Sequence, residues 1–268
     1  MRAVSALSTH PIVATALGEC VGQVLEALGG TRPGLVLVAV TPPHLGTLDD
    51  VGRALGDLLA PDVVVGAVAP AVVGDGRQVE AEAALVLFAL HGVTASPLLL
   101  VPDGDGGLAR SGHHEGATAA VVLGDPFSCS GAALAAALPG IDAAGGLVAV
   151  ARGPGGSRLL LQGAVRTSGA VGALLGPPAQ VRASAGGTTA LEVEADLAAV
   201  LASSSPGMTA ALLFPGAGRG GDADLVAELL GAPVAGVGVG APLAPRGGAS
   251  ALHGPHATGL VLFPSPIP

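Results

Sequence analysis

The chain has 268 residues, 50% of them apolar, and a formal net charge of −9 at pH 7. This length and composition suffice for one large or two modest domains with a sizeable core. All 11 basic residues are Arg and they form no basic cluster, so nucleic acid and anionic membrane surfaces are excluded as expected partners.

The apolar content raises the question of a membrane span. The longest uncharged stretch, Ala83–Val101, is interrupted by Gly92 and Pro97, whereas a spanning helix needs about 20 unbroken apolar residues. The amino-terminal residues lack the apolar core of a signal peptide. Cys20 and Cys129 are two thiols without metal-ligand spacing, which suits a reducing compartment. We therefore expect a cytoplasmic protein with no membrane partner.

The predicted elements begin with a helix over Ile12–Leu28, ended by Gly29 and Gly30. Three groups then follow in the order strand, helix, strand, polar connection, strand. The first group is Gly34–Val40, Leu48–Ala60, Val63–Val68 and Ala83–Leu90. The second is Thr118–Leu123, Gly131–Leu138, Gly146–Ala151, Arg158–Ala164 and Gly169–Leu175. The third is Thr209–Phe214, a helix after Asp222, Val234–Val239 and Thr258–Phe263.

The matching spacing of these groups indicates a repeated βαββ block. The first strands begin near residues 35, 118 and 209, and the second strands near 63, 146 and 234. We expect an α/β fold: mixed β-sheets flanked by helices, in two packed subdomains built from three βαββ quasi-repeats. Residues 1–176 would hold two units and residues 177–268 the third, divided at Gly176-Pro177-Pro178.

Within each unit, the first two strands should be parallel, joined by a right-handed crossover, and the third antiparallel at the end. Leu35–Val40, Ala119–Leu123 and Ala210–Phe214 should be equivalent buried strands.

Several stretches resemble one known family. LLFPGAGRG, VAGVGVGAPLAP and LHGPHATGLVLF are similar to the C-terminal part of the FIST sensory domain. VVVGAVAPAVVGDGRQVEAEAALVLFAL and LGDPFS resemble its N-terminal part. The resemblance covers most of the chain in order. It implies a ligand-sensing module of bacterial signal transduction, which would act here through a partner protein, and it implies binding more than catalysis.

The chain departs from the family pattern in two places. Family members usually carry a cysteine and an acidic residue in a GCS-x-x-GE-like turn, where this chain has Ala67, Ala69 and Ala71. The segment after Pro178 is also shorter than in the family, and Glu192–Ala202 can form a helix within it. Chemistry that needs that thiol or carboxylate is therefore not expected.

A glycine turn follows the first strand of the third unit. Gly216, Gly218 and Gly221 fit the dinucleotide pattern G-x-G-x-x-G between a strand and a helix. Against a dinucleotide, no Asp or Glu follows Glu228 to bind the ribose, and a P-loop is excluded because the chain has no Lys. No cofactor is therefore expected.

A small anion suits the same turn better. Backbone amides of Gly218, Gly220 and Gly221, together with the Arg219 guanidinium, could hold a carboxylate or phosphate. Arg219 also matches a position that FIST members usually fill with Arg. The alternative is that Arg219 pairs with a neighbouring aspartate on the surface.

Two further parts complete the predicted site. The second-strand turn contains Gly236 and Gly238, which leave room beside it, and His253 matches a family histidine, with loop packing as its alternative. Ligands of α/β units bind at the carboxyl ends of the strands. We therefore expect a small anionic ligand where glycine turns of different units converge.

Other reactive residues leave alternatives open. Cys129 lies beside a helix start, which could activate a thiol, but no histidine accompanies it and a buried structural role is favoured. His113 and His114 with Glu115 suggest either a metal site or, as we expect, an exposed loop. The competing functions are thus a ligand-binding sensor, an enzyme using Cys129 or the Arg219 turn, and a scaffold that has lost its ligand.

Overall fold

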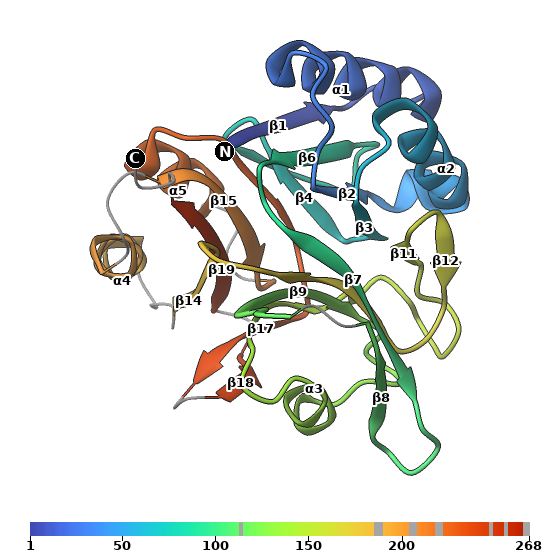
Figure 1. Cartoon of the computed structure of the whole chain (residues 1–268), viewed down its shortest axis with the longest axis vertical. Coiled ribbons are helices and arrows are strands. Elements are labelled where there is room, and N and C mark those ends of the chain that lie inside the picture. The colour runs from blue at the N-terminus through green and yellow to red at the C-terminus, as the bar shows by residue number, and fades with distance from the viewer. Residues whose placement is uncertain are drawn as a thin grey trace.

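A computed structural model describes residues 1–112, 115–184, 190–203, 208–217, 222–246, 249–254 and 257–264. In these residues the chain forms a mixed α/β fold of three mixed sheets with five α-helices. Figure 1 shows the sheets arranged around a common centre with the helices outside them. The expected fold class is confirmed.

Each sheet is named here by its strands in spatial order. Sheet A contains β1 (Arg2–Ser8), β6 (Leu85–His91), β2 (Leu35–Val40), β3 (Val63–Val68), β11 (Leu159–Leu161) and β12 (Ala164–Arg166). Sheet B contains β14 (Gln180–Ser184), β19 (Thr258–Pro264), β15 (Met208–Pro215), β16 (Val234–Val237), β4 (Ala71–Gly74) and β5 (Arg77–Glu80). Sheet C contains β18 (Ala249–Leu252), β17 (Ala241–Arg246), β10 (Asp142–Leu147), β9 (Ala119–Gly124), β13 (Ala170–Leu175), β7 (Ala95–Pro102) and β8 (Leu108–Ser111).

The helices cover the outer faces of the sheets. They are α1 (Val13–Leu28), α2 (Leu48–Leu59), α3 (Gly131–Ala137), α4 (Ala190–Ala202) and α5 (Asp222–Leu230), with a 3₁₀ turn η1 (Pro42–Thr47) before α2. Helices α1 and α2 pack on sheet A, α3 on sheet C, and α4 and α5 lie beside sheet B (Figure 1). Gly29 ends α1 in the left-handed conformation, at φ 62°, as the sequence predicted.

Each central strand is apolar on both faces because it is buried on both. In β2, Leu35, Leu37 and Ala39 face a core shared by all three sheets, while Val36 and Val38 face the helices. The same alternation holds in the other central strands. The rings of Phe88 in sheet A and Phe263 in sheet B meet in the shared core, with centroids 6.0 Å apart.

The three units pair their strands in the same way. The first and second strands are parallel in every unit: β2 with β3, β9 with β10, and β15 with β16. The third strand is antiparallel to the first: β6 to β2, β13 to β9, and β19 to β15. The strands β2, β9 and β15, predicted to be equivalent and buried, each have a neighbour on both sides.

The third strand of each unit also has a neighbour on both sides. β1 pairs with the other edge of β6, β7 with that of β13, and β14 with that of β19. The sequence analysis placed no strand at residues 2–8, which form β1.

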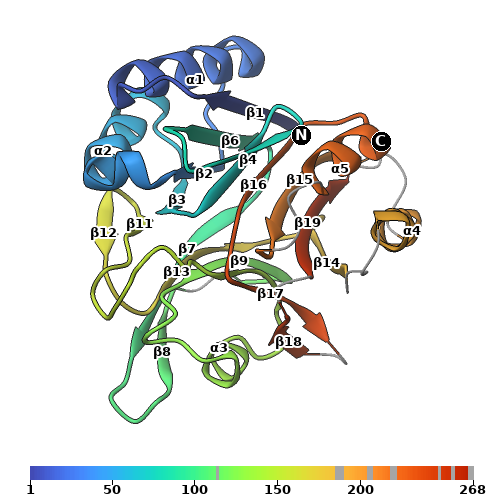
Figure 2. The same cartoon turned by 180° about the vertical axis from the view of Figure 1, so that it is seen from behind.

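Hairpins exchange between the units in a cycle. The β4–β5 hairpin follows β3 of sheet A but pairs with β16 of sheet B, as Figure 2 shows. The β11–β12 hairpin follows β10 of sheet C and pairs with β3 of sheet A. The β17–β18 hairpin follows β16 of sheet B and pairs with β10 of sheet C. Strand pairing thus crosses the predicted boundary at residues 176–177 in both directions, and the boundary itself stays a prediction.

A glycine occupies the same place in the second strand of every unit. Gly66 pairs with Val38, Gly145 with Val122 and Gly236 with Leu213. A Cβ atom on these glycines would lie 2.2, 1.8 and 2.2 Å from the carbonyl oxygen of the paired residue. Only glycine permits this close approach of two strands.

Two local predictions were wrong. The strand expected at Gly146–Ala151 is β10 at Asp142–Leu147, because its whole length pairs with β9 and the double glycine lies inside it. The strand expected at Arg158–Ala164 is a hairpin that turns at Gln162-Gly163.

The apolar stretch over residues 83–101 divides into β6 and β7, as expected. No helix in the described part of the chain has the length and apolar character to cross a bilayer.

Candidate functional site

A cavity lies at the carboxyl ends of β15 and β16, where parallel strands of an α/β sheet present their loops. It measures about 190 Å³. Its walls come from all three units: the ends of β15 and β16, the segment after β3, the β5 strand and the segment after β10. The lining residues are Pro70, Ala71, Gln78, Glu80, Ala149, Pro215, Gly216, Ala217, Gly238, Val239 and Gly240.

The same position exists at the end of the first strand in all three units. The N–H of the residue just after the first strand donates to the carbonyl of the residue just before the unit's last strand. The bonds run from Thr41 to Ala84, from Asp125 to Gly169 and from Gly216 to Ala257, at 3.0, 2.9 and 3.0 Å. Thr41, Asp125 and Gly216 are therefore structurally equivalent, and their side chains can be compared directly.

In the second unit, a polar network fills this position. The Asp125 carboxylate accepts hydrogen bonds from Ser128 Oγ and Ser157 Oγ, both at 2.6 Å. Ser128 Oγ in turn accepts from the Gly169 N–H at 2.8 Å. Asp125 and Ser157 are buried. This network connects the first strand to the loop that leads into β11, and its bonded side chains occupy the position.

In the first unit, a threonine fills the position. Thr41 is fully buried, and its hydroxyl donates to the Glu82 carbonyl at 2.6 Å and accepts from the Ala84 N–H at 2.8 Å. These bonds tie β2 to the segment before β6. The first unit is therefore closed at this point as well.

In the third unit, the position is Gly216, which has no side chain, and the cavity opens there. Nearby, Thr258 Oγ1 donates to the buried Asp222 carboxylate at the start of α5. Of the three equivalent positions, two hold a bonded side chain and the third is open. This difference identifies the carboxyl ends of β15 and β16 as the candidate site.

The structure brings some of the predicted residues together at this cavity. Gly216 and Gly238 line it, together with Gly240. A Cβ atom on Gly238 would lie 2.8 Å from the Ala71 side chain, so glycine allows this segment to approach the β4 strand. Gly218, Arg219, Gly220 and Gly221 lie outside the described residues.

Two other predicted residues have structural contacts. Gly236 does not line the cavity; it lies in β16, where its small size permits pairing with Leu213. His253 lies after the β17–β18 hairpin, and its Nε2 is 3.2 Å from the Ala244 carbonyl oxygen. Its Nδ1 lies 3.4 Å from the Arg246 guanidinium. These contacts match the loop-packing alternative for His253.

The sequence analysis missed two polar residues of the site, Gln78 and Glu80. Glu80 is exposed and Gln78 is half-buried. Both residues line the cavity from β5, which reaches sheet B only through the hairpin exchange. Alternating polar residues on an edge strand were a signal, but the sequence did not indicate that residues more than 130 positions later would complete the wall.

The two thiols show no sign of activation. Both are buried, and burial raises the pKa of Cys129 to about 11 and that of Cys20 to about 12. A raised pKa keeps the thiol protonated at neutral pH, which opposes nucleophilic chemistry. The predicted structural role of Cys129 therefore fits its surroundings.

A metal site finds no support in the described ranges. These residues contain no group of three His, Cys, Asp or Glu side chains that could hold a metal ion. His113 and His114, the residues of the metal alternative, lie outside them, and Glu115 is exposed.

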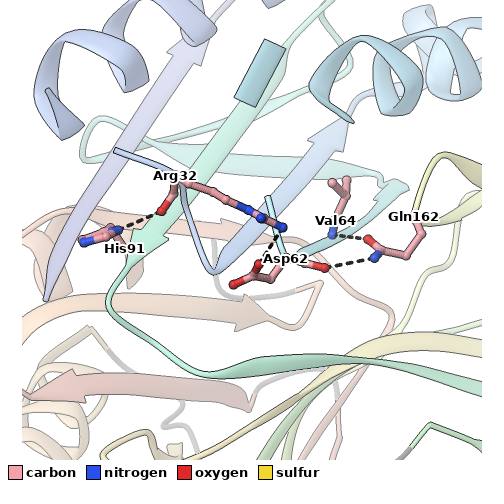
Figure 3. Close-up of polar contacts among 5 residues, drawn as sticks. All are labelled: Arg32, Asp62, Val64, His91 and Gln162. Carbon is pink, nitrogen blue, oxygen red and sulfur yellow. Dashed lines mark hydrogen bonds and ion pairs between the residues drawn. The ribbon is translucent and has the colours of Figure 1, made fainter. Parts of the chain in front are cut away.

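A larger and shallower hollow of about 380 Å³ lies near the amino end of β3, between α2 and the β11–β12 turn. Its polar side chains are already bonded. The Val64 N–H donates to Gln162 Oε1 at 2.7 Å, and Gln162 Nε2 donates to the Asp62 carbonyl at 3.0 Å (Figure 3). Arg53 pairs with Asp50 at 3.0 Å. We therefore do not choose this hollow as the site.

Polar contacts near this hollow connect the segments before β2 and β3 with the end of β6. Arg32 pairs with Asp62 at 2.7 Å, and His91 Nδ1 lies 2.8 Å from the Arg32 carbonyl oxygen (Figure 3). The β17–β18 hairpin is held to β10 as Gln162 holds the β11–β12 hairpin to β3: the Ala143 N–H donates to Ser250 Oγ at 2.8 Å. Gln162 and Ser250 thus each bind an exchanged hairpin to the strand beside it, whereas the Arg32 contacts lie within the first unit.

Comparison with known proteins gives two findings. The family model described as FIST N domain matches residues 34–194. The uncharacterized protein Mb0898c of Mycobacterium bovis is 31% identical over 184 residues, which cover 65% of this chain and 47% of that protein. The uncharacterized protein MT0656 of Mycobacterium tuberculosis is 30% identical over 184 residues, covering 65% of this chain and 48% of that protein. The chain spans about half the length of the curated relatives it matches. The resemblance of residues 212–263 to the C-terminal part of the family is not covered by the family match and stays a prediction.

Proposed function

The chain belongs to the FIST family, whose members are generally sensory domains of signal transduction, and we propose that it is a ligand-binding module that acts through a partner protein. The observation that carries this proposal is the open position at Gly216, since the equivalent Thr41 and Asp125 are filled and bonded. The ligand would occupy the cavity of about 190 Å³ at the carboxyl ends of β15 and β16.

We propose further that the ligand carries an anionic group, as the sequence analysis suggested. The support is the sequence Gly218-Arg219-Gly220-Gly221, which directly follows Ala217 of the cavity wall. A guanidinium paired with a desolvated carboxylate or phosphate contributes about 1.5–3 kcal/mol. Arg219→Ala should therefore weaken binding about tenfold or more and leave the fold unchanged, whereas Arg246→Ala serves as the control.

The alternatives are an enzyme and a scaffold without a ligand. The high pKa of Cys129 argues against thiol chemistry, and an enzyme would have to use the glycine turn. A scaffold would bind nothing in the cavity. A sensor binds a small molecule and leaves it unchanged, whereas an enzyme would convert it and a scaffold would bind none.

Native mass spectrometry of freshly purified protein tests the proposal. We expect a co-purified small molecule that is lost from Ala149→Leu, because the exposed Ala149 lies on the cavity wall and a leucine there would fill it. Ala14→Leu, on the exposed side of α1, should keep the molecule. A ligand that stays bound to Ala149→Leu, or no ligand in either the mass spectrum or a metabolite screen by calorimetry, would contradict the proposed site.

A further inference from the structure

Among the described residues, only the β5 strand contributes polar side chains to the cavity wall. Gln78 and Glu80 belong to β5 and flank Val79, which faces the shared core, so the two polar side chains lie on the same face of the strand. The other described lining residues are Gly, Ala, Pro and Val. Any selective polar contact with this part of the wall must therefore involve Gln78 or Glu80, or the backbone.

The Gln78 amide is oriented by its neighbour. Its Nε2 donates to Glu80 Oε1 at 2.5 Å. A carboxylate only accepts hydrogen bonds, so the amide nitrogen must face Glu80 and the amide oxygen must face away. Gln78 Oε1 is buried and accepts no hydrogen bond from the described residues. Because this oxygen is buried, a ligand in the cavity does not reach it, and Gln78 acts on the cavity through the Glu80 carboxylate that its amide nitrogen holds.

Glu80 also lacks a cationic partner. Within the described residues, the ion pairs join Arg32 to Asp62 and Arg53 to Asp50, and none involves Glu80. Its one described side-chain contact is the hydrogen bond from Gln78. The carboxylate therefore retains accepting capacity on the cavity side of β5.

The backbone of the wall offers few donors in return. The N–H groups of Gly216, Gly238, Val239 and Gly240 already donate to carbonyl oxygens at 2.9–3.0 Å. These four amides are not free to hold an anion. Apart from the second amide hydrogen of Gln78, the described side chains of the wall present one carboxylate and apolar surface. The chemical complement of that carboxylate is a cationic donor.

We propose that the β5 side of the cavity receives a positively charged nitrogen group of the ligand, a primary ammonium, which donates to the Glu80 carboxylate. This inference rests on the proposed ligand-binding function and adds the chemical class. The cavity has room for about six water molecules at roughly 30 Å³ each, which restricts the ligand to a small amine.

The test uses n-butylammonium as the probe and the full chain labelled for amide NMR. We expect a saturable shift of the amide signals of Gly216, Gly238 and Gly240. Glu80→Gln should lower the affinity at least about fivefold, because a neutral amide replaces the carboxylate. Glu82→Gln, the matched exposed neighbour just beyond β5, should leave it unchanged. Gln78→Met keeps the side-chain length without the amide and should also weaken binding.

The outcomes separate this inference from the proposed function. If Ala149→Leu loses a co-purified ligand but n-butylammonium binds equally to wild type and Glu80→Gln, the cavity binds a ligand and the ammonium contact is wrong. If the probe shifts none of the three amides, the inference is also overturned. If n-butylammonium binds in a Glu80-dependent way but neither native mass spectrometry nor the metabolite screen finds a ligand, the amine site stands and the proposed sensory role is contradicted. A thermal scan of each variant confirms that it is folded.

Discussion

Replacement of Gly236 by alanine tests whether this glycine serves strand pairing or ligand binding. Gly236 lies opposite Leu213, and a Cβ atom there would be 2.2 Å from the Leu213 carbonyl oxygen and 3.1 Å from its Cβ. To reach even 3.0 Å from that oxygen, the strands must separate locally by 0.8 Å. β15 and β16 are both buried in the middle of sheet B, so neither can move freely.

The expected cost follows from two effects. Overpacking of a well-packed core costs about 1–3 kcal/mol, and one or two weakened hydrogen bonds between the strands add about 1 kcal/mol each. We therefore expect Gly236→Ala to lower the free energy of unfolding by about 3 kcal/mol. For a chain of this size, that corresponds to a Tm lower by roughly 6–12 °C.

Scanning calorimetry measures this change, with far-UV circular dichroism as a second probe because the chain has no Trp or Tyr. Gly66→Ala, at the equivalent place in sheet A, should be destabilised to a similar degree. Gly22→Ala is the control: it lies on α1 in open space and should gain about 0.5–1 kcal/mol. An unchanged Tm for Gly236→Ala, combined with lost ligand binding, would refute the packing role and restore Gly236 to the binding site.

Three further predictions concern reactivity, the exchanged hairpin and pH. At pH 8 the pKa of Cys129, about 11, leaves it roughly a two-hundredth of the thiolate fraction of a free cysteine. A thiol reagent should therefore label Cys129 at least about 200-fold more slowly than it labels the unfolded chain. Rapid stoichiometric labelling would revive the enzyme alternative. Gln162→Ala removes the bonds to the Val64 N–H and the Asp62 carbonyl and should cost about 1–2 kcal/mol by denaturant titration; an unchanged midpoint would show that the β11–β12 hairpin needs no such contact. Partial burial raises the pKa of Asp75, so protonation favours the folded state and its contribution to stability is lost as pH rises through the folded-state pKa; Asp75→Asn should thus be relatively more stable than wild type at pH 7 than at pH 4, and the opposite trend in Tm would contradict the burial effect.

The sequence by itself determined the elements and their local order. Apolar runs such as Leu35–Val40 and Val63–Val68 predict buried strands because strands buried on both faces have no polar side. The spacing of the three groups predicted parallel first and second strands with an antiparallel third. These features depend on contacts within one unit, and the pattern of apolar residues along neighbouring positions predicts them.

The site was only partly accessible to the same reasoning. Gly216 and Gly238 were predicted because a glycine turn after a strand has a recognisable pattern. Gly236 follows the same pattern, but its neighbour across the sheet gives it a packing role. Turn composition alone does not distinguish a glycine that leaves room for a ligand from one that leaves room for another strand.

Only the tertiary structure decided which unit is open and what lines its cavity. The exchange of hairpins brings Gln78 and Glu80 of the first unit beside Gly216 of the third, across more than 130 residues of chain. It also places Ser157 against Asp125 and so closes the second unit. Pairing between distant edge strands is specified by shape and register over a whole sheet, and no stretch of neighbouring residues encodes it.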